Sequence, residues 1–310
     1  MKKLILSFML LAMTIANYAQ APGTMPFAMP QTNPDFKDVN YAGDTLEAHR
    51  LDIYLPKEGQ APYKVIVAIY GSAWFANNMK PFAYMSLGKA LTDAGYAVVS
   101  INHRSSADAK YPAQINDVKA AIRFIRAHAK AYQLDTSFIG ITGFSSGGHL
   151  SSMAGVTNNL PKKDINGVSI DIEGKVGDCL NESSRVDAVV DWFGPVDMAH
   201  MNKCTTTNDD KSPEAALIGG DPRKMSEMVS LISPVDYVAE AQNCPRFLVI
   251  HGDSDTVVPH CQSENFAAAL KKAGKLVDFI TVPKGQHGPV TFNENTLKKM
   301  VEFFKTEEKK

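Results

Sequence analysis

The residues from Gly143 to His149 carry the strongest chemical signal in this chain, because they contain a Gly-x-Ser-x-Gly pattern centred on Ser145. In that pattern the serine occupies a strained turn between a strand and a helix and exposes its hydroxyl at the end of a sheet. The apolar run 138–142 precedes the turn, and the small residues 149–156 can form the helix after it. This context predicts that Ser145 is a nucleophile rather than part of an ordinary Gly-Ser turn.

A nucleophilic serine needs two partners, and loops after later strands could supply them. Its hydroxyl is weakly nucleophilic at neutral pH unless a neutral imidazole accepts its proton and a carboxylate orients that imidazole. His287 follows the last expected strand and Asp255 follows the strand before it, so we expect His287 to be the base and Asp255 its partner. Asp253 is expected to bond backbone amides of its own turn. Asp197, after a still earlier strand, remains a third candidate for the acid.

When a serine attacks the carbonyl group of an ester, a negative charge develops on the carbonyl oxygen, and the site must supply hydrogen-bond donors for this oxyanion. The backbone amide of Ser146, directly after the nucleophile, is expected to be one donor. The second is expected from the loop 70–74, which follows an early strand and contains Ser72 and Ala73. Small side chains allow either amide to face the pocket, so the choice between Ser72 and Ala73 stays open.

Three aromatic residues next to expected strand ends are candidates for the wall of the substrate pocket: Trp74, Trp192 and Phe193. Their rings could stack on a sugar or on an aromatic acyl group. The alternative interpretation is that they fill the core.

Apolar runs alternate with segments of helical spacing along the chain. The expected strands are 51–55, 65–70, 96–101, 138–142, 186–192, 247–251 and 276–282. The expected helices are 83–94, 115–131, 149–156, 265–272 and 295–304. This alternation predicts an α/β fold with a mostly parallel central sheet covered by helices on both faces. Ligands of such sheets bind beyond the carboxyl ends of the strands, which is where the candidate residues lie.

The N-terminus has the layout of a secretory signal peptide. Lys2 and Lys3 precede an apolar run that is short for a membrane span, and small residues follow it up to Ala19. We expect a signal peptide at 1–19, an extended leader at 20–40 and a single catalytic domain at 41–310. The mature protein is then exported to the bacterial periplasm or the extracellular space without a stable membrane anchor; a permanent anchor helix is the alternative.

The formal net charge of −1 gives no reason to expect nucleic acid or an anionic membrane surface as a partner. The four cysteines share no metal-ligand spacing, and we expect neither a metal nor another cofactor. Export permits disulfides, and four cysteines allow three full pairings. A bridge between Cys179 and Cys204, which flank one expected strand, is one interpretation; free cysteines are the other.

Several longer segments carry a family resemblance: 111–117, 120–123, 143–150, 184–195, 251–259 and 287–288. They resemble the esterase and lipase group of the α/β-hydrolases, and most closely the secreted bacterial carbohydrate esterases that include feruloyl and acetyl-xylan esterase-like proteins. The resemblance implies an α/β-hydrolase fold, and the chain order Ser145, Asp255, His287 is the order of that fold's triad. It also implies an oligosaccharide or small-molecule ester substrate, with acetyl or feruloyl-type groups removed from plant polysaccharides.

Two departures from the family pattern concern supporting residues. Tyr70 begins the loop in which the family usually has a His-Gly-Gly-Gly-Trp-type sequence, so the backbone donors are retained although the side chain differs. His103 stands where a tyrosine often precedes the arginine, here Arg104. We interpret His103, Arg104 and His149 as structural supports rather than as bases.

The sequence thus favours a secreted serine carboxylic ester hydrolase that works through an acyl-enzyme intermediate. A serine peptidase of the prolyl-oligopeptidase type shares the elbow, but no paired-glutamate anchor for an amine stands out. A non-enzymatic carbohydrate-binding module on the same scaffold is disfavoured because Ser145, Asp255 and His287 are all present. No long apolar lid segment is found near these residues, which disfavours a triglyceride lipase.

Overall fold

The computed structural model describes residues 29–310 of the chain. The expected signal peptide at 1–19, and with it the expected export, therefore lies outside the described residues. Within 29–310, none of the helices combines the length and the apolar character that crossing a membrane would require.

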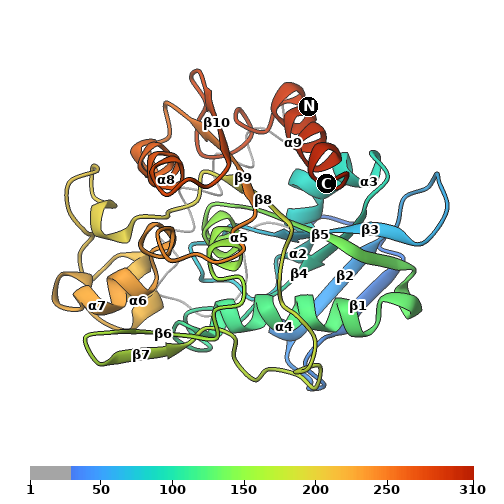
Figure 1. The fold of residues 1–310 in the computed structure, drawn as a ribbon, viewed down its shortest axis with the longest axis horizontal. Coiled ribbons are helices and arrows are strands. Elements are labelled where there is room, and N and C mark those ends of the chain that lie inside the picture. The colour runs from blue at the N-terminus through green and yellow to red at the C-terminus, as the bar shows by residue number, and fades with distance from the viewer. Residues whose placement is uncertain (1–28) are drawn as a thin grey trace.

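Eight strands form one sheet in the order β1-β2-β4-β3-β5-β8-β9-β10 (Figure 1). Their bounds are β1 Phe36–Asn40, β2 Arg50–Tyr54, β3 Tyr63–Ile69, β4 Ala97–Ile101, β5 Leu134–Phe144, β8 Ala188–Trp192, β9 Arg246–Gly252 and β10 Val277–Val282. Strand β2 runs antiparallel to β1 and to β4, and the pairs from β4 to β10 are parallel. This confirms the α/β fold with a mostly parallel sheet, and all seven expected strands are present.

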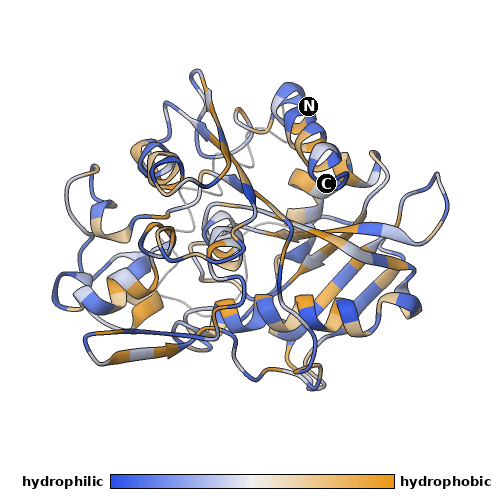
Figure 2. Ribbon diagram, viewed as in Figure 1, coloured by the Kyte–Doolittle hydropathy of each residue, from blue (hydrophilic) through white to orange (hydrophobic). Residues whose placement is uncertain are grey.

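Helices cover both faces of the sheet because its central strands are apolar on both sides, as expected for buried parallel strands. One face carries α4 Ala113–Ala127, α5 Ser146–Val156 and α8 Cys261–Lys272; the other carries α2 Lys80–Ala83, a π-helical turn Tyr84–Gly88, α3 Lys89–Thr92 and α9 Glu294–Glu307. Each face of the sheet has its own hydrophobic core, and strand β3 contributes to both. Val67 and Ile69 belong to the core under α4 and α5, and Ile66 and Ala68 belong to the core on the opposite face. Figure 2 shows the largely apolar strands in the middle of the molecule.

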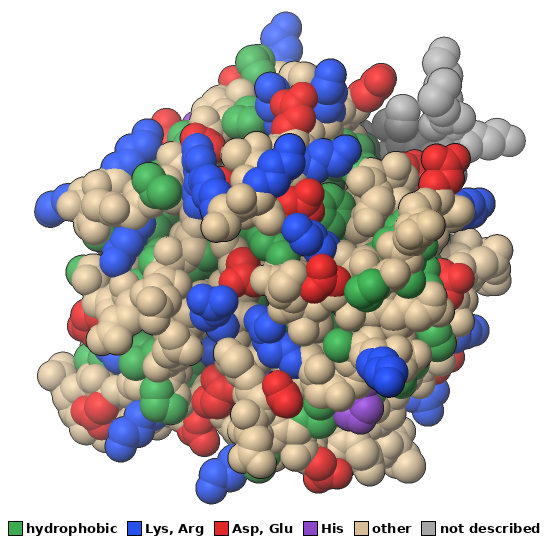
Figure 3. Space-filling view, turned by 45° about the vertical axis from the view of Figure 1, so that its right-hand side comes forward, with side chains coloured by type: hydrophobic (Ala, Val, Ile, Leu, Met, Phe, Trp, Pro, Cys, Tyr) green, Lys and Arg blue, Asp and Glu red, His purple; other side chains and the backbone are tan. Residues whose placement is uncertain are grey.

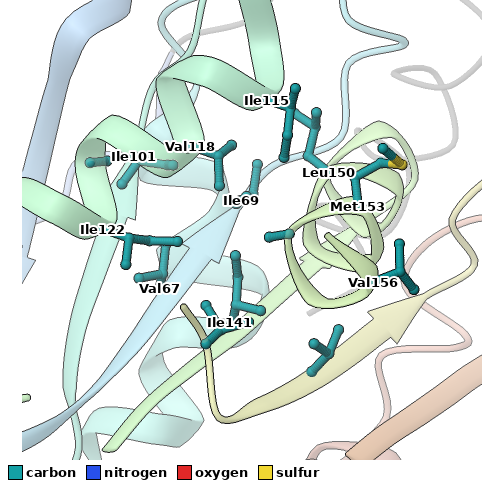
Figure 4. Packing of buried hydrophobic residues seen from close by; sticks show 14 of the residues in the cluster. Val67, Ile69, Ile101, Ile115, Val118, Ile122, Ile141, Leu150, Met153 and Val156 are labelled. Carbon is teal, nitrogen blue, oxygen red and sulfur yellow. The ribbon is translucent and has the colours of Figure 1, made fainter. Parts of the chain in front are cut away.

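The larger core lies between the sheet and helices α4 and α5 (Figure 4). Ile115, Val118 and Ile122 recur at three- and four-residue steps along α4, so one side of the helix faces Val67 and Ile101 of the sheet. These side chains are fully buried. On the face seen in Figure 3, basic and acidic side chains are interspersed and neither sign forms a separate area.

An insert between β8 and β9 lies beyond the carboxyl ends of the parallel strands, on the left of Figure 1. It contains α6 Pro213–Ile218, α7 Ser226–Leu231 and short 3-10 turns at Met198–His200, Pro222–Lys224 and Pro234–Tyr237. A two-stranded hairpin, β6 Lys162–Ile165 and β7 Val168–Asp171, stands apart from the main sheet and contacts α7. None of these elements was predicted from the sequence.

Two sequence-based expectations are corrected by the fold. The sheet begins with β1 at Phe36, so the domain starts before residue 41 and takes in part of the expected leader at 20–40. The disulfide joins Cys204 to Cys261, with the Cα atoms 6.1 Å apart, and not Cys179 to Cys204. Cys179 lies beside Phe124 and His128 near the end of α4, whereas the Cys204 loop folds against the first residue of α8. Cys179 and Cys244 are free.

Candidate active site

Ser145 lies at the junction of β5 and α5 in a backbone conformation that non-glycine residues rarely adopt, with φ 54° and ψ −126°. Its amide donates to the Trp192 carbonyl at 2.9 Å, which holds the turn against β8. A Cβ atom on Gly143 would come within 2.3 Å of the Gly147 carbonyl oxygen, so the strand and the helix pack this closely only because residue 143 is glycine. Ser145 is partly exposed, although the residues on either side of it are buried.

The structure brings Ser145, His287 and Asp255 into one hydrogen-bonded chain. His287 Nε2 lies 2.9 Å from Ser145 Oγ, and His287 Nδ1 lies 2.8 Å from Asp255 Oδ2. Because a carboxylate only accepts, the His287 proton is assigned to Nδ1, which leaves the Nε2 lone pair for the serine hydroxyl. This tautomer is the one that a general base at His287 requires.

The loops that carry Asp255 and His287 are held together by their backbones. A Cβ atom on Gly252 would lie 2.2 Å from the Gly285 carbonyl carbon, so only glycine permits this crossing. Asp253 stabilises the crossing, because its Oδ1 accepts the Lys284 amide at 2.7 Å. Asp253 thus bonds backbone, as expected, although the partner lies in the other loop.

The third candidate acid, Asp197, pairs with His200 and not with His287. Both carboxylate oxygens of Asp197 lie 2.9 Å from His200 Nδ1. Of the three aspartates considered from the sequence, Asp255 is therefore the one that contacts the candidate base.

The side chain of Asp255 is buried, and both of its carboxylate oxygens have polar partners. Its Oδ1 accepts the amides of Val257 at 2.8 Å and Val258 at 3.0 Å, and its Oδ2 faces His287 and, at 3.3 Å, His251 Nε2. Burial by itself raises the pKa of Asp255, but the hydrogen bonds and charges of His251 and His287 outweigh it and hold that pKa well below its usual range. Asp255 is therefore a carboxylate across the neutral range. No role was predicted for His251 from the sequence, although it stands four residues before Asp255.

The two candidate loops for oxyanion binding meet at Ser146. Ser146 begins α5, and the first amides of a helix have no carbonyl partner within it. The Ser72 amide donates to Ser146 Oγ at 2.8 Å and is therefore already used. Ala73 follows with φ 51°, and its amide has no acceptor among residues 29–310. The unused backbone donors here include those of Ser146 and Ala73.

The three aromatic residues expected in the pocket wall are part of the core instead. Trp74 is 1% exposed, Trp192 0% and Phe193 1%, so they offer almost no surface to a ligand. The Phe193 ring packs 4.7 Å from the His287 ring, measured between centroids, and therefore restricts the position of the imidazole. Burying these large apolar side chains stabilises the fold, which explains why they pack in the core and do not stack on a ligand.

His103, Arg104 and His149 make structural contacts, as the sequence suggested. Arg104 pairs with buried Asp117 at 2.6 Å, and His103 Nδ1 lies 2.9 Å from the Arg104 carbonyl. His149 Nδ1 accepts the Trp74 indole N–H at 3.2 Å, and its Nε2 donates to the Ile232 carbonyl at 2.8 Å. His149 thus ties the 70–74 loop to the insert. The described residues hold no cluster of three or more His, Cys, Asp or Glu side chains suited to a metal ion.

Burial of His149 makes stability depend on pH in the acidic range. Burial lowers the pKa of His149 to about 4, although the bond to the Ile232 carbonyl opposes this. In the unfolded chain an imidazole takes up its proton near pH ~6.5, so between these values the unfolded state binds more protons and stability falls as pH falls. We expect this residue alone to cost about 2–3 kcal/mol of unfolding free energy on going from pH 7.5 to pH 4.5.

Urea unfolding of the wild type and of His149→Gln at both pH values measures this contribution. The glutamine amide can keep both hydrogen bonds but does not titrate, so the pH-dependent loss should be smaller by about 2–3 kcal/mol in the variant. An equal loss in both proteins would contradict the assignment.

Comparison with known proteins places this geometry in a family. The BD-FAE family model matches residues 51–270. The probable carboxylic ester hydrolase LipM of Mycobacterium tuberculosis is 32% identical, over 87% of this chain and 60% of its own length. The chain spans only about half the length of the curated relatives that it matches, 49% in the case of the esterase LipQ of the same organism.

Two solved structures are similar over most of this chain. One, a bifunctional GH43-CE protein of Bacteroides eggerthii, is 62% identical with a TM-score of 0.86, over 88% of this chain and 35% of the other. The second, described as a truncated form of a carbohydrate esterase from gut microbiota, is 55% identical with a TM-score of 0.87, over 89% and 96%. The chain belongs to the BD-FAE family and has the α/β-hydrolase fold of its esterases.

Proposed function

We propose that this protein is a serine carboxylic ester hydrolase that acts on esterified carbohydrates. The observation that carries the proposal is the chain of hydrogen bonds from Ser145 Oγ through His287 to Asp255, at 2.9 and 2.8 Å. Membership of an esterase family and the likeness to carbohydrate esterases support it.

The reaction proceeds through a covalent acyl-enzyme. His287 Nε2 takes the proton of Ser145 as Oγ attacks the ester carbonyl carbon, and Asp255 stabilises the imidazolium that forms. Collapse of the tetrahedral intermediate breaks the ester C–O bond, and His287 returns the proton to the departing alcohol. Water, deprotonated by His287, then attacks the acyl group and releases the carboxylic acid and free Ser145.

The developing oxyanion accepts hydrogen bonds from the amides of Ser146 and Ala73 in this proposal. The assignment of Ala73 instead of Ser72 rests on the hydrogen bond that already uses the Ser72 amide. In the transition state, negative charge develops on the carbonyl oxygen, and these two amides are positioned to donate to it. They therefore stabilise the transition state more than the planar ester.

We propose acetyl or feruloyl-type groups on plant polysaccharides as the acyl groups removed. An aromatic cluster of Phe144, Trp192, Phe193 and Phe292 supports small acyl groups, because Phe292 packs at 5.4, 5.1 and 5.2 Å, between ring centroids, from the other three rings. The cluster reaches the catalytic residues through Phe193, whose ring centroid lies 4.7 Å from that of His287, so rings fill the space on that side of the imidazole.

A panel of esters tests this function. We expect kcat/KM to fall from acetyl and butyryl nitrophenyl esters to decanoyl and longer ones, because each methylene that finds no apolar space forfeits about 0.8 kcal/mol of burial. Acetylated xylan and methyl ferulate should both be tried as natural-type substrates. A preference for long-chain esters would favour a lipase and remove the carbohydrate proposal; peptide cleavage without ester cleavage would favour a peptidase.

We also propose that the protein is exported, to the periplasm or beyond the cell. The basic and apolar start of the chain supports this, and so does the Cys204–Cys261 disulfide, since such bonds persist in oxidising compartments. Fractionation of the native host should find the protein outside the cytoplasm with its N-terminus near residue 20; full-length protein in the cytoplasm would refute the proposal.

A further inference from the structure

We propose that His251 is a positioning residue for the proposed ester hydrolysis, a second imidazole that holds the Asp255 carboxylate, and that Ser263 sets its tautomer. The inference rests on the proposed function, and it extends the chain of polar contacts to five residues in the order Ser263, His251, Asp255, His287 and Ser145.

The ring of His251 is fully buried at the end of β9, and its Nε2 faces two acceptors. The Val258 carbonyl oxygen lies 3.0 Å from Nε2, and Asp255 Oδ2 lies 3.3 Å from it. A carbonyl and a carboxylate can only accept hydrogen bonds, so the proton of His251 is on Nε2. This single N–H donates to the Val258 carbonyl and also lies within ion-pair distance of the Asp255 carboxylate.

Ser263 on α8 completes the assignment from the other side of the ring. Its Oγ lies 2.7 Å from His251 Nδ1, and Ser263 is fully buried. With Nε2 protonated, the neutral ring presents a lone pair at Nδ1, and the Ser263 hydroxyl donates to it. The other tautomer would direct a lone pair of His251 at the carboxylate. The Cys204–Cys261 disulfide anchors the start of the helix that holds Ser263.

His251 and His287 meet at the same oxygen of Asp255. The two amides on Oδ1 fix one end of the carboxylate, and the two imidazoles fix Oδ2. Without the His251 donor, one side of Oδ2 would be buried and unpaired, which favours the protonated form of the carboxyl group and loosens its orientation. A protonated or rotated Asp255 cannot hold His287 in the tautomer that accepts the serine proton.

The titratable groups around His251 must be known before a change in the pH profile of a His251 variant can be interpreted. They are Asp255 in the following loop, His260, whose ring centroid is 5.3 Å away, and buried Asp191 on the neighbouring strand β8. His260 contacts Thr281 and Glu264 and makes no contact with Asp255. It therefore serves as a matched control for a change of imidazole in this region.

The experiment compares His251→Phe, His251→Gln, Ser263→Ala and His260→Phe with the wild type. For each, kcat and KM for nitrophenyl acetate are measured from pH 4 to pH 9, and folding is monitored by circular dichroism. We expect His251→Phe to lower kcat about ten- to hundredfold, the effect of one lost hydrogen bond to a charged group, with KM little changed. Its acidic limb should shift to higher pH. His251→Gln, which keeps a donor, should recover most of the loss.

Ser263→Ala should shift the acidic limb in the same direction by less, and His260→Phe should match the wild type. The proposal is overturned if folded His251→Phe keeps the wild-type kcat and pH profile, or if His251→Gln is as impaired as His251→Phe. If His251→Phe does not fold, an unchanged acidic limb in folded Ser263→Ala overturns it. Full activity of Ser145→Ala would instead refute the proposed function itself, whatever the His251 variants do.

Discussion

Ser145→Ala should abolish ester hydrolysis while the protein remains folded. Removal of Oγ removes the atom that forms the acyl-enzyme, and loss of a triad nucleophile typically costs on the order of a millionfold in kcat. The adjacent hydroxyl cannot replace it, since Ser146 is buried and its Oγ already accepts the Ser72 amide at 2.8 Å. Stability should change little, because alanine can occupy the same strained turn as serine and the Ser145 amide keeps its bond to Trp192.

Hydrolysis of nitrophenyl acetate and thermal unfolding should be measured together, with Ser151→Ala as the control. That control removes a buried hydroxyl of α5 that donates to the Gly147 carbonyl, at 2.8 Å, and leaves the 2.9 Å contact between Ser145 and His287 in place, so it should keep most of the activity. Near-normal turnover by folded Ser145→Ala would rule out the serine mechanism. Comparable losses in both variants would show that the turn, and not the Ser145 hydroxyl, had been disturbed.

The sequence predicted the frame of the site because the relevant signals are local. An apolar run, a Gly-x-Ser-x-Gly turn and a small-residue helix define β5, Ser145 and α5 within a short window. Parallel strands then bring distant loops to one edge of the sheet, so His287 and Asp255 could be expected beside Ser145 from chain order alone. The preference for Asp255 over Asp253 agrees with the contacts found.

The remaining features depend on tertiary contacts that no local window contains. Cys204 pairs with Cys261 because the insert folds onto α8, and its short helices, six residues each in α6 and α7, depend on packing rather than on their own propensity. Trp74 follows the end of β3 and Trp192 is the last residue of β8, as residues of a pocket wall would be, yet both side chains lie in the core. Likewise, only the structure shows that Ser146 Oγ uses the Ser72 amide.

Asp255→Asn should lower kcat by about ten-thousandfold, the loss expected when the carboxylate that orients a catalytic imidazole becomes an amide. The amide nitrogen can donate to His287 Nδ1, which then becomes the acceptor, and the proton moves to Nε2, where it faces Ser145 Oγ. The base is lost although every heavy atom keeps its place. KM should change little, since the Asp255 side chain is buried and does not contact a substrate directly.

Asp197→Asn and Asp253→Asn are the matched controls, because each makes the same chemical change in a neighbouring loop. Asp197 pairs with His200, so Asp197→Asn should leave kcat nearly unchanged. Asp253 accepts the Lys284 amide, three residues before His287, so its loss should be mild and should act through the position of that loop. Steady-state kinetics of the three variants at one pH distinguish these roles. If Asp197→Asn were the crippling change, the 2.8 Å contact between Asp255 and His287 would not be the catalytic one, since only a carboxylate hydrogen-bonded to the base can select its tautomer.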